Sequence, residues 1–196
     1  SKHSAQAPFL YEFITRVLND KSEGPNCKKI EQLRKELCKS EQTIIITDFG
    51  AGSHVNNSKN RKVKDVAKNS AKNSKFGKLL YRIIQFYKPK NILELGTSLG
   101  ISTLYLAKAE KNSKVYTFEG CPKTAKIAQQ NFNKMDAVNI NITLGDFQNT
   151  LQDKLKEITT IDLAFIDGNH QQKPIITYFE ECLKYTHNNT IFIFDD

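Results

Sequence analysis

A glycine turn marks the part of the chain best suited to chemistry. Residues 92–100 read Ile-Leu-Glu-Leu-Gly-Thr-Ser-Leu-Gly, so an apolar run stops at Gly96, passes through small or polar residues and restarts at Gly100. This pattern is typical of a strand, a tight turn and the start of a helix. Such a turn brings a ligand close to bare backbone, and the helix that follows offers N–H groups. The segment therefore predicts a nucleotide-like ligand at the carboxyl end of a parallel strand.

Acidic residues near the turn narrow the choice of ligand. Glu94 stands two residues before Gly96, where a carboxylate would repel a pyrophosphate but can pair with an ammonium group. This charge favours S-adenosylmethionine over a dinucleotide as the cofactor. The alternative is that the turn alone could belong to any nucleotide-binding protein of this general architecture. We expect the cofactor turn to consist of Glu94, Gly96, Thr97, Ser98 and Gly100.

Later positions match the remaining parts of such a cofactor. Glu119 follows Gly100 by nineteen residues, close to the ~20-residue offset at which an acidic side chain meets a ribose, and its two oxygens can accept from both hydroxyls. Gly145 and Asp146 end a later apolar run, where Asp146 can accept from an exocyclic amine. The ring of Phe147 can stack on a purine. Because Gly-Asp is also an ordinary loop dipeptide, a plain turn is the alternative here.

The order of predicted elements brings these residues to one edge of a sheet. Strands are expected at about 91–95, 114–118, 140–144, 161–166 and 190–194, and helices near 99–109, 122–134, 147–157 and 171–186. Five strands joined by four helical crossovers predict an α/β fold with a doubly wound parallel sheet. Because its strands end at one edge, Asp167 after the fourth strand and Asp195 with Asp196 after the fifth converge there. The alternative for each carboxylate is a cofactor contact or a helix cap.

The first part of the chain predicts a helical extension of this core. Apolar residues recur at helical spacing in residues 9–18 and again in residues 30–37, and a longer amphipathic helix is expected over residues 76–87. We expect residues 1–75 to form a helical extension with a basic loop that packs on the core. Residues 76–196 would form the cofactor-binding core itself.

Composition limits the classes of protein to consider. The 196 residues carry 29 Lys and Arg against 21 Asp and Glu, and the segment from Lys59 to Lys90 holds eleven of the positive charges with Asp65 as its one acidic residue. That excess predicts either a solvated, lysine-rich surface or a patch for nucleic acid or an anionic substrate. No apolar run approaches the ~20 residues of a membrane span. Free thiols and a cytoplasmic location are favoured by four scattered cysteines, Cys27, Cys38, Cys121 and Cys182.

With these residues in view, the segment from about Lys78 to Asp196 resembles the class I S-adenosylmethionine-dependent methyltransferases. It is most similar to the small-molecule O-methyltransferases of the catechol and caffeoyl-CoA type. The resemblance rests on the turn at Gly96 and Gly100 and on Glu119 at the end of the second strand. It implies a Rossmann-like methyltransferase fold, S-adenosylmethionine as the cofactor and a hydroxyl of a small molecule as the methyl acceptor. It also implies two further strands after the fifth, which this segment lacks.

The resemblance further implies a metal and a base beside the cofactor. In metal-dependent members, the aspartate after the fourth strand and an Asp-Asn pair after the fifth bind a divalent cation such as Mg²⁺. Asp167 and Asp195 match this pattern, and Asp196 replaces the asparagine. A lysine that often acts as the base is replaced by His170, whose neutral imidazole can take a proton near pH 7. Asp167 and His170 are thus the expected catalytic residues.

Two other functions stay open. The basic segment from Lys59 to Lys90 could serve an RNA methyltransferase, although the end of the fourth strand lacks the Asn/Asp-Pro-Pro-Tyr/Phe motif of enzymes that grip a flipped base. A module that binds a nucleoside without catalysis would keep the same turn. We expect a small-molecule acceptor and no membrane partner, and we leave a homodimer open.

Overall fold

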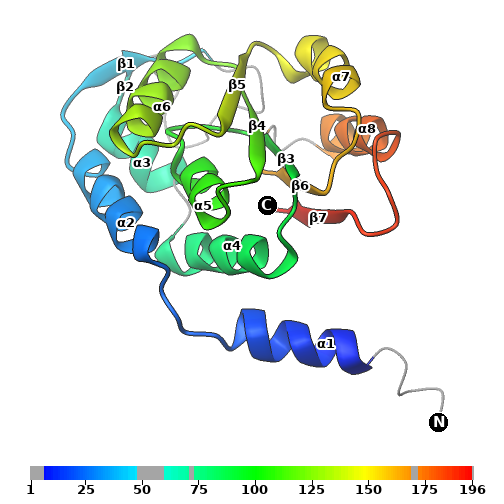
Figure 1. Ribbon diagram of the computed structural model, residues 1–196. Coiled ribbons are helices and arrows are strands. Elements are labelled where there is room, and N and C mark those ends of the chain that lie inside the picture. The colour runs from blue at the N-terminus through cyan, green and yellow to red at the C-terminus, as the bar shows by residue number, and fades with distance from the viewer. Residues whose placement is uncertain (1–6, 48–59, 71–72, 169–171, 196) are drawn as a thin grey trace.

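The computed structural model describes residues 7–47, 60–70, 73–168 and 172–195, and a five-stranded sheet forms its centre (Figure 1). The strands are β3 (Asn91–Leu95), β4 (Lys114–Glu119), β5 (Ile140–Leu144), β6 (Leu163–Ile166) and β7 (Ile191–Phe194). They lie in the order β5-β4-β3-β6-β7, and every neighbouring pair is parallel. The predicted doubly wound parallel sheet is therefore confirmed.

Helices cover both faces of this sheet because alternate strand residues point to opposite sides. The crossover helices are α5 (Ile101–Ala109), α6 (Pro122–Lys134), α7 (Phe147–Ile158) and α8 (Gln172–Leu183). The first two lie on one side of the sheet and the last two on the other (Figure 1). On β3, Ile92 packs in the same cluster as Leu106 of α5, whereas Leu93 packs in the cluster of Leu151 of α7. Alternation along one strand thus builds both layers of the core.

Helix α4 (Ser74–Tyr87) fixes where β3 begins. The side chain of Asn73 caps its first turn by accepting a hydrogen bond from the backbone N–H of Phe76 at 2.9 Å. Its other end is Lys88, a left-handed residue with φ 50°, whose N–H donates to the carbonyl of Ile84 at 2.8 Å. Pro89 cannot continue the helix, so the chain turns at once into the central strand.

The N-terminal extension packs as an outer layer over α5 and α6. It consists of α2 (Pro25–Leu37), β1 (Thr43–Ile45), β2 (Asn60–Lys62) and α3 (Val63–Ser70) after the first helical segment. The expected basic loop needs correction, because residues 60–70 form a strand and a helix. Val63, Val66 and Ala67 lie at helical spacing and are buried in one cluster with Ile30 and Leu33 of α2. Their contact with α2 stabilises a helix that the lysine-rich composition concealed.

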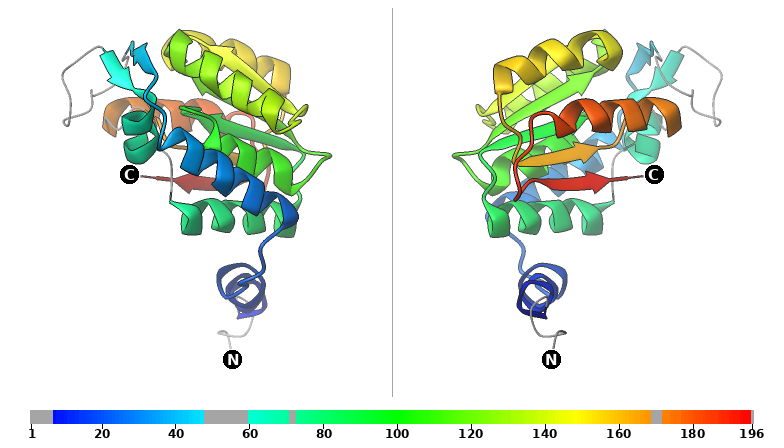
Figure 2. Two further views of the ribbon diagram at one scale, coloured as in Figure 1. Left: turned by 90° about the vertical axis from the view of Figure 1, so that its left-hand side faces the viewer. Right: turned by 90° about the vertical axis from the view of Figure 1, so that its right-hand side faces the viewer.

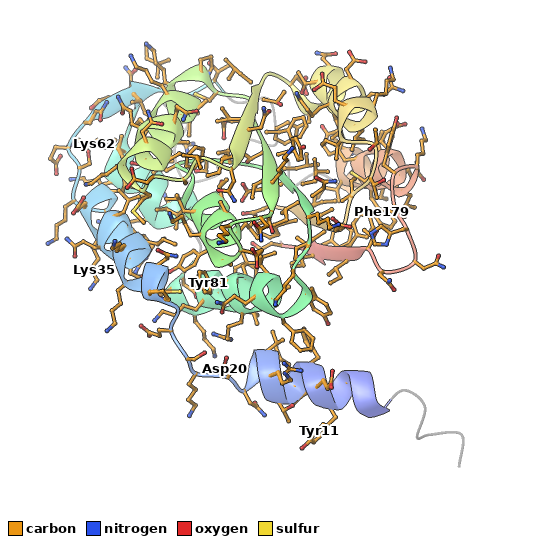
Figure 3. All side chains as sticks on the ribbon, in the orientation of Figure 1. Tyr11, Asp20, Lys35, Lys62, Tyr81 and Phe179 are labelled. Carbon is orange, nitrogen blue, oxygen red and sulfur yellow. The ribbon has the colours of Figure 1, made fainter. Side chains whose placement is uncertain are left out.

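The first helical segment touches the rest of the chain along one side. α1 (Ala7–Phe13) continues as the π-helix η1 (Ile14–Leu18), and both lie beneath α4 (Figure 2). Val17 is buried, and its carbonyl accepts a hydrogen bond from Nε of Arg82 at 2.7 Å. Tyr11 is exposed and points away from α4 (Figure 3). In the ranges that the structure describes, every helix is too short or too polar to cross a membrane.

Candidate functional site

The glycine turn lies between the ends of three strands. The N–H groups of Gly96 and Thr97 both donate to the carbonyl of Phe118 on β4, at 3.1 and 3.0 Å. Gly96 has φ +106°, and a Cβ there would lie 2.7 Å from the carbonyl oxygen of Asp167 after β6. Gly100, with φ +82°, precedes α5, and a Cβ there would lie 2.4 Å from the ring of Phe132. Neither position has room for a side chain, so the turn presents bare backbone at the edge of the sheet.

Glu119 is bound to this turn by backbone hydrogen bonds. Its Oε2 accepts from the N–H of Ser98 at 2.8 Å, and its Oε1 accepts from the N–H of Cys121 at 2.8 Å. The carboxylate therefore joins the turn to the start of α6 and has a fixed orientation. Each carboxylate oxygen has two lone pairs, and these two bonds use one lone pair of each oxygen. The predicted role of Glu119 at a ribose is compatible with this geometry.

Glu94 lies behind the turn and not at its surface. Its side chain is 0% exposed, and its Oε2 accepts from the hydroxyls of Thr103 on α5 at 2.5 Å and Thr117 on β4 at 2.7 Å. The hydroxyl of Thr117 also lies 2.6 Å from that of Thr97 in the turn. Burial raises the pKa of the Glu94 carboxyl to about 7. Oε1 has no hydrogen-bond partner in the described part of the chain. Neither threonine partner carried a signal in the sequence.

The residues expected at an adenine have structural roles as well. Asp146 caps α7, because its Oδ1 accepts from the N–H of Gln148 at 3.0 Å. The sequence left a plain turn open as the alternative for Asp146, and this cap was not predicted. Phe147 packs edge-on against Phe118 at 6.2 Å and against Tyr178 at 5.8 Å between ring centroids. Its ring therefore faces the core between α7, α8 and the sheet, and only its outer part remains for a ligand.

The edge of the sheet at the glycine turn is called the rim below. Two of the carboxylates that the sequence predicts there follow adjacent strands. Asp167 donates its N–H to the carbonyl of Leu95 at 2.9 Å, and Asp195 donates its N–H to the carbonyl of Ile166 at 3.1 Å. These bonds continue the strand pairing and bring both residues to the same edge as Gly96. His170 and Asp196 lie outside the described residues, so the structure does not place them. Within the described ranges, no three His, Cys, Asp or Glu side chains gather as a metal site.

Cys121 connects the extension to the rim. Its Sγ accepts from the N–H of Thr47 at 3.4 Å and donates to the carbonyl of Ile45 at 3.6 Å. The thiol is 3% exposed and stands directly before Pro122, the first residue of α6. The sequence offered no sign of this contact, which holds the end of β1 beside Glu119.

Sequence comparisons identify relatives of this chain. Residues 93–196 match the family model described as a methyltransferase domain. A catechol O-methyltransferase of Niastella koreensis is 33% identical over 123 residues, which cover 61% of this chain and 55% of the relative. A catechol O-methyltransferase of Mycobacterium tuberculosis is 28% identical over 129 residues, covering 65% and 56% respectively. The chain thus spans about half the length of these curated relatives.

Solved structures share the fold. An O-methyltransferase from Streptomyces achromogenes, in complex with S-adenosylmethionine, matches with a TM-score of 0.61 and 20% identity over 89% of this chain and 66% of its own. A methyltransferase of Podospora anserina, bound to S-adenosylhomocysteine, matches with a TM-score of 0.66 and 18% identity over 100% of this chain and 70% of its own. At these identities the likeness establishes a common fold, which agrees with the predicted one.

Proposed function

Because the chain belongs to the methyltransferase domain family, we propose that it binds S-adenosylmethionine and transfers the methyl group to a hydroxyl of a small molecule. One observation carries the proposal. Gly96 and Gly100 in the turn are packed too tightly for side chains, and Glu119 is bound to the turn through the N–H of Ser98. The similarity to two catechol O-methyltransferases supports a phenolic acceptor.

The residues at the rim fit this cofactor. Gly96 lets the turn pack directly against the backbone of Asp167, and the first turn of α5 has no side-chain cap among the described residues, which leaves its N–H groups for a ligand. Glu119 offers an oriented carboxylate to a ribose. Oε1 of buried Glu94 has no hydrogen-bond partner in the described part of the chain and keeps capacity for a donor.

The chain's own task in the reaction is positioning. When bound, the cofactor supplies a methyl group on a sulfonium, so no covalent enzyme intermediate is needed. Alignment of an acceptor oxygen with that methyl group then determines the rate. Asp167 after β6 stands at the edge where an acceptor would approach, and we assign the uptake of the hydroxyl proton to His170 three residues later.

We propose a divalent cation as an additional component of the site. Asp167 and Asp195, on neighbouring strand ends, together with Asp196 would hold it through hard oxygen ligands suited to Mg²⁺, Mn²⁺ or Ca²⁺. The cation would lower the pKa of the acceptor hydroxyl. Turnover is measured before and after treatment with a chelator. Loss of turnover that returns with added Mg²⁺ supports the cation, and unchanged turnover removes it from the proposal.

The RNA methyltransferase alternative gains no support from the basic segment. In the described part of that segment, Lys62 and Lys64 both pair with Glu41, and Lys78 pairs with Glu23. Paired lysines release fewer counterions on binding a phosphate backbone. A small-molecule acceptor therefore remains the proposal.

Calorimetry and a substrate panel test the proposed function. We expect S-adenosylhomocysteine to bind with one site per chain, and S-adenosylmethionine to be converted to it in the presence of catechols or other phenols. Absence of binding would contradict the cofactor. Turnover confined to RNA or protein acceptors would contradict the acceptor class while leaving the cofactor assignment intact.

A further inference from the structure

A cavity of about 470 Å³ is lined by residues of α7 and α8. These two helices lie on the side of the sheet away from α5 and α6 (Figure 1). We call the cavity the α7–α8 groove. Its floor is apolar, since Leu151 and Tyr178 are each 2% exposed and Phe147 packs against Tyr178. Its volume is typical of cavities that bind small molecules, for which roughly 300–1,000 Å³ is usual. The outer edge of the groove is polar and is formed by Gln148, Gln152 and Glu181.

Glu181 has an incomplete set of hydrogen bonds. Its Oε1 accepts from Nζ of Lys184, one turn later on α8, at 2.7 Å. Its Oε2 is buried and has no hydrogen-bond partner in the described part of the chain. Buried carboxylate oxygens in native proteins nearly always have a partner, so an unpaired one points to a ligand or a bound water.

The charge of the α7–α8 groove selects the kind of ligand. Glu181 carries the only charge among the described residues that line it, whereas the whole chain has a net charge of +8. An anion would be repelled at Oε2, and a neutral apolar molecule would leave this oxygen unpaired. A cation with an apolar body can pair with the carboxylate and pack against the apolar floor.

We propose that the α7–α8 groove binds an organic ammonium compound. The ammonium group pairs with the carboxylate of Glu181, whose side chain is 28% exposed. The apolar or aromatic body lies on Leu151 and Tyr178, and the amides of Gln148 and Gln152 bond to polar groups at its outer end.

The groove is distinct from the rim that holds Glu119, and α8 presents different faces to its neighbours. Phe179 of α8 turns toward β7 and packs against Phe192 at 4.8 Å between ring centroids (Figure 3). Tyr178 and Glu181 face α7 instead. The groove shares Phe147 with the predicted adenine site, and none of its described lining residues belongs to the glycine turn. The inference does not rest on the proposed function.

Titration of the full-length protein with phenethylammonium chloride tests the inference, with protein NMR as the readout. We expect shifts at α7 and α8, and about ten-fold weaker binding of neutral 2-phenylethanol, since it lacks the charge-assisted bond. Glu181→Gln should weaken phenethylammonium binding by a similar factor of about ten. Glu180→Gln, the same change at an exposed neighbour on α8, is the matched control and should bind as the wild type.

Two further variants keep the test decisive if Glu181→Gln folds poorly. Gln152→Trp adds bulk at the exposed outer edge of the groove and should block binding, and Lys184→Met removes the competing cation and should strengthen it. Equal affinity in Glu181→Gln and the wild type would overturn the inference. Displacement of the probe by S-adenosylhomocysteine would also overturn it, because the probe would then occupy the cofactor turn. Failure of S-adenosylhomocysteine to bind at all counts against the proposed function only.

Discussion

The rim at the glycine turn and the N-terminal extension are stabilised by different kinds of contact. At the rim, Glu94 and Thr117 are 0% exposed, and the hydrogen bonds among them and Thr97 are buried. In the extension, many polar contacts are surface ion pairs, such as that of Lys62 with the exposed Glu41. Exposed pairs of this kind contribute little to stability, whereas a buried polar network loses much when one member is changed.

Because of this difference, we expect mutations in the two regions to have different effects. Changes at the rim are expected to alter cofactor affinity and stability together, because the same groups shape the turn at which we propose that the cofactor binds. Changes in the extension are expected to alter stability alone.

Gly96→Ala is expected to have the largest effect. Its Cβ would lie 2.7 Å from the carbonyl oxygen of Asp167, and its φ of +106° is unfavourable for alanine. We expect a loss of roughly 3 kcal/mol in the free energy of unfolding and a fall in turnover on the order of a hundred-fold. Urea unfolding and S-adenosylhomocysteine release measure these quantities. Ser98→Gly, in the same turn, is the control that should remain active, and a fully active Gly96→Ala protein would refute the tight packing.

Glu94 makes the stability of the rim depend on pH. Its folded pKa of about 7 lies above the ordinary glutamate value of 4.5, so the folded state holds the proton more tightly than the unfolded chain. This contribution to stability is complete below about pH 4.5, falls as pH rises, and is lost above about pH 7. The loss is at most about 3 kcal/mol, at 1.36 kcal/mol for each pKa unit.

Urea unfolding at pH 5 and pH 8 measures this dependence. Glu94→Gln keeps the shape and removes the titration, so the difference in unfolding free energy between the two pH values should shrink relative to the wild type. The same difference in both proteins would mean that another group causes it. Glu180→Gln, an exposed neutralisation on α8, serves as the control.

The sequence predicted the core better than the extension for a physical reason. Each core strand is a short apolar run bounded by turn residues, so its pattern is local and the parallel order follows from the helical crossovers. Helix α3 depends on contacts between Val66 and α2, which are distant in sequence, and its lysines gave the appearance of a loop.

The site was predicted unevenly for a related reason. Gly96, Gly100 and Glu119 act through backbone geometry, which glycine and strand-end positions reveal in the sequence. The contacts of Glu94 with Thr103 and Thr117 depend on the pairing of β3 with β4 and the packing of α5. Threonine is common on strands and helices, so its type alone could not identify these partners.

Glu119→Ala is expected to affect binding more than folding. The change removes the acceptors for Ser98 and Cys121 and the predicted contacts with a ribose. Because each hydrogen bond to a charged group contributes about 1.5–3 kcal/mol, we expect at least about ten-fold weaker binding of S-adenosylhomocysteine. Calorimetry measures it, with Glu12→Gln on α1 as a distant control. Wild-type affinity in Glu119→Ala would remove this residue from the site.

Tyr105→Phe tests the extension with the smallest change. The hydroxyl of Tyr105 on α5 donates to Oε1 of Glu31 on α2 at 2.6 Å, and Oε2 of Glu31 also accepts from Nη2 of Arg34 at 2.9 Å. Phenylalanine keeps the buried ring, and Glu31 keeps its arginine partner, so we expect a loss of about 1 kcal/mol in the free energy of unfolding.

Affinity for S-adenosylhomocysteine should not change in Tyr105→Phe, because the lost bond joins two helices and touches no residue of the turn. Urea unfolding and calorimetry on the same preparation separate the two effects, and Tyr11→Phe on the exposed side of α1 should change neither. A weakening of affinity comparable to that of Glu119→Ala would mean that α5 transmits strain from the extension to its own first turn, and the two regions would then have to be treated as one.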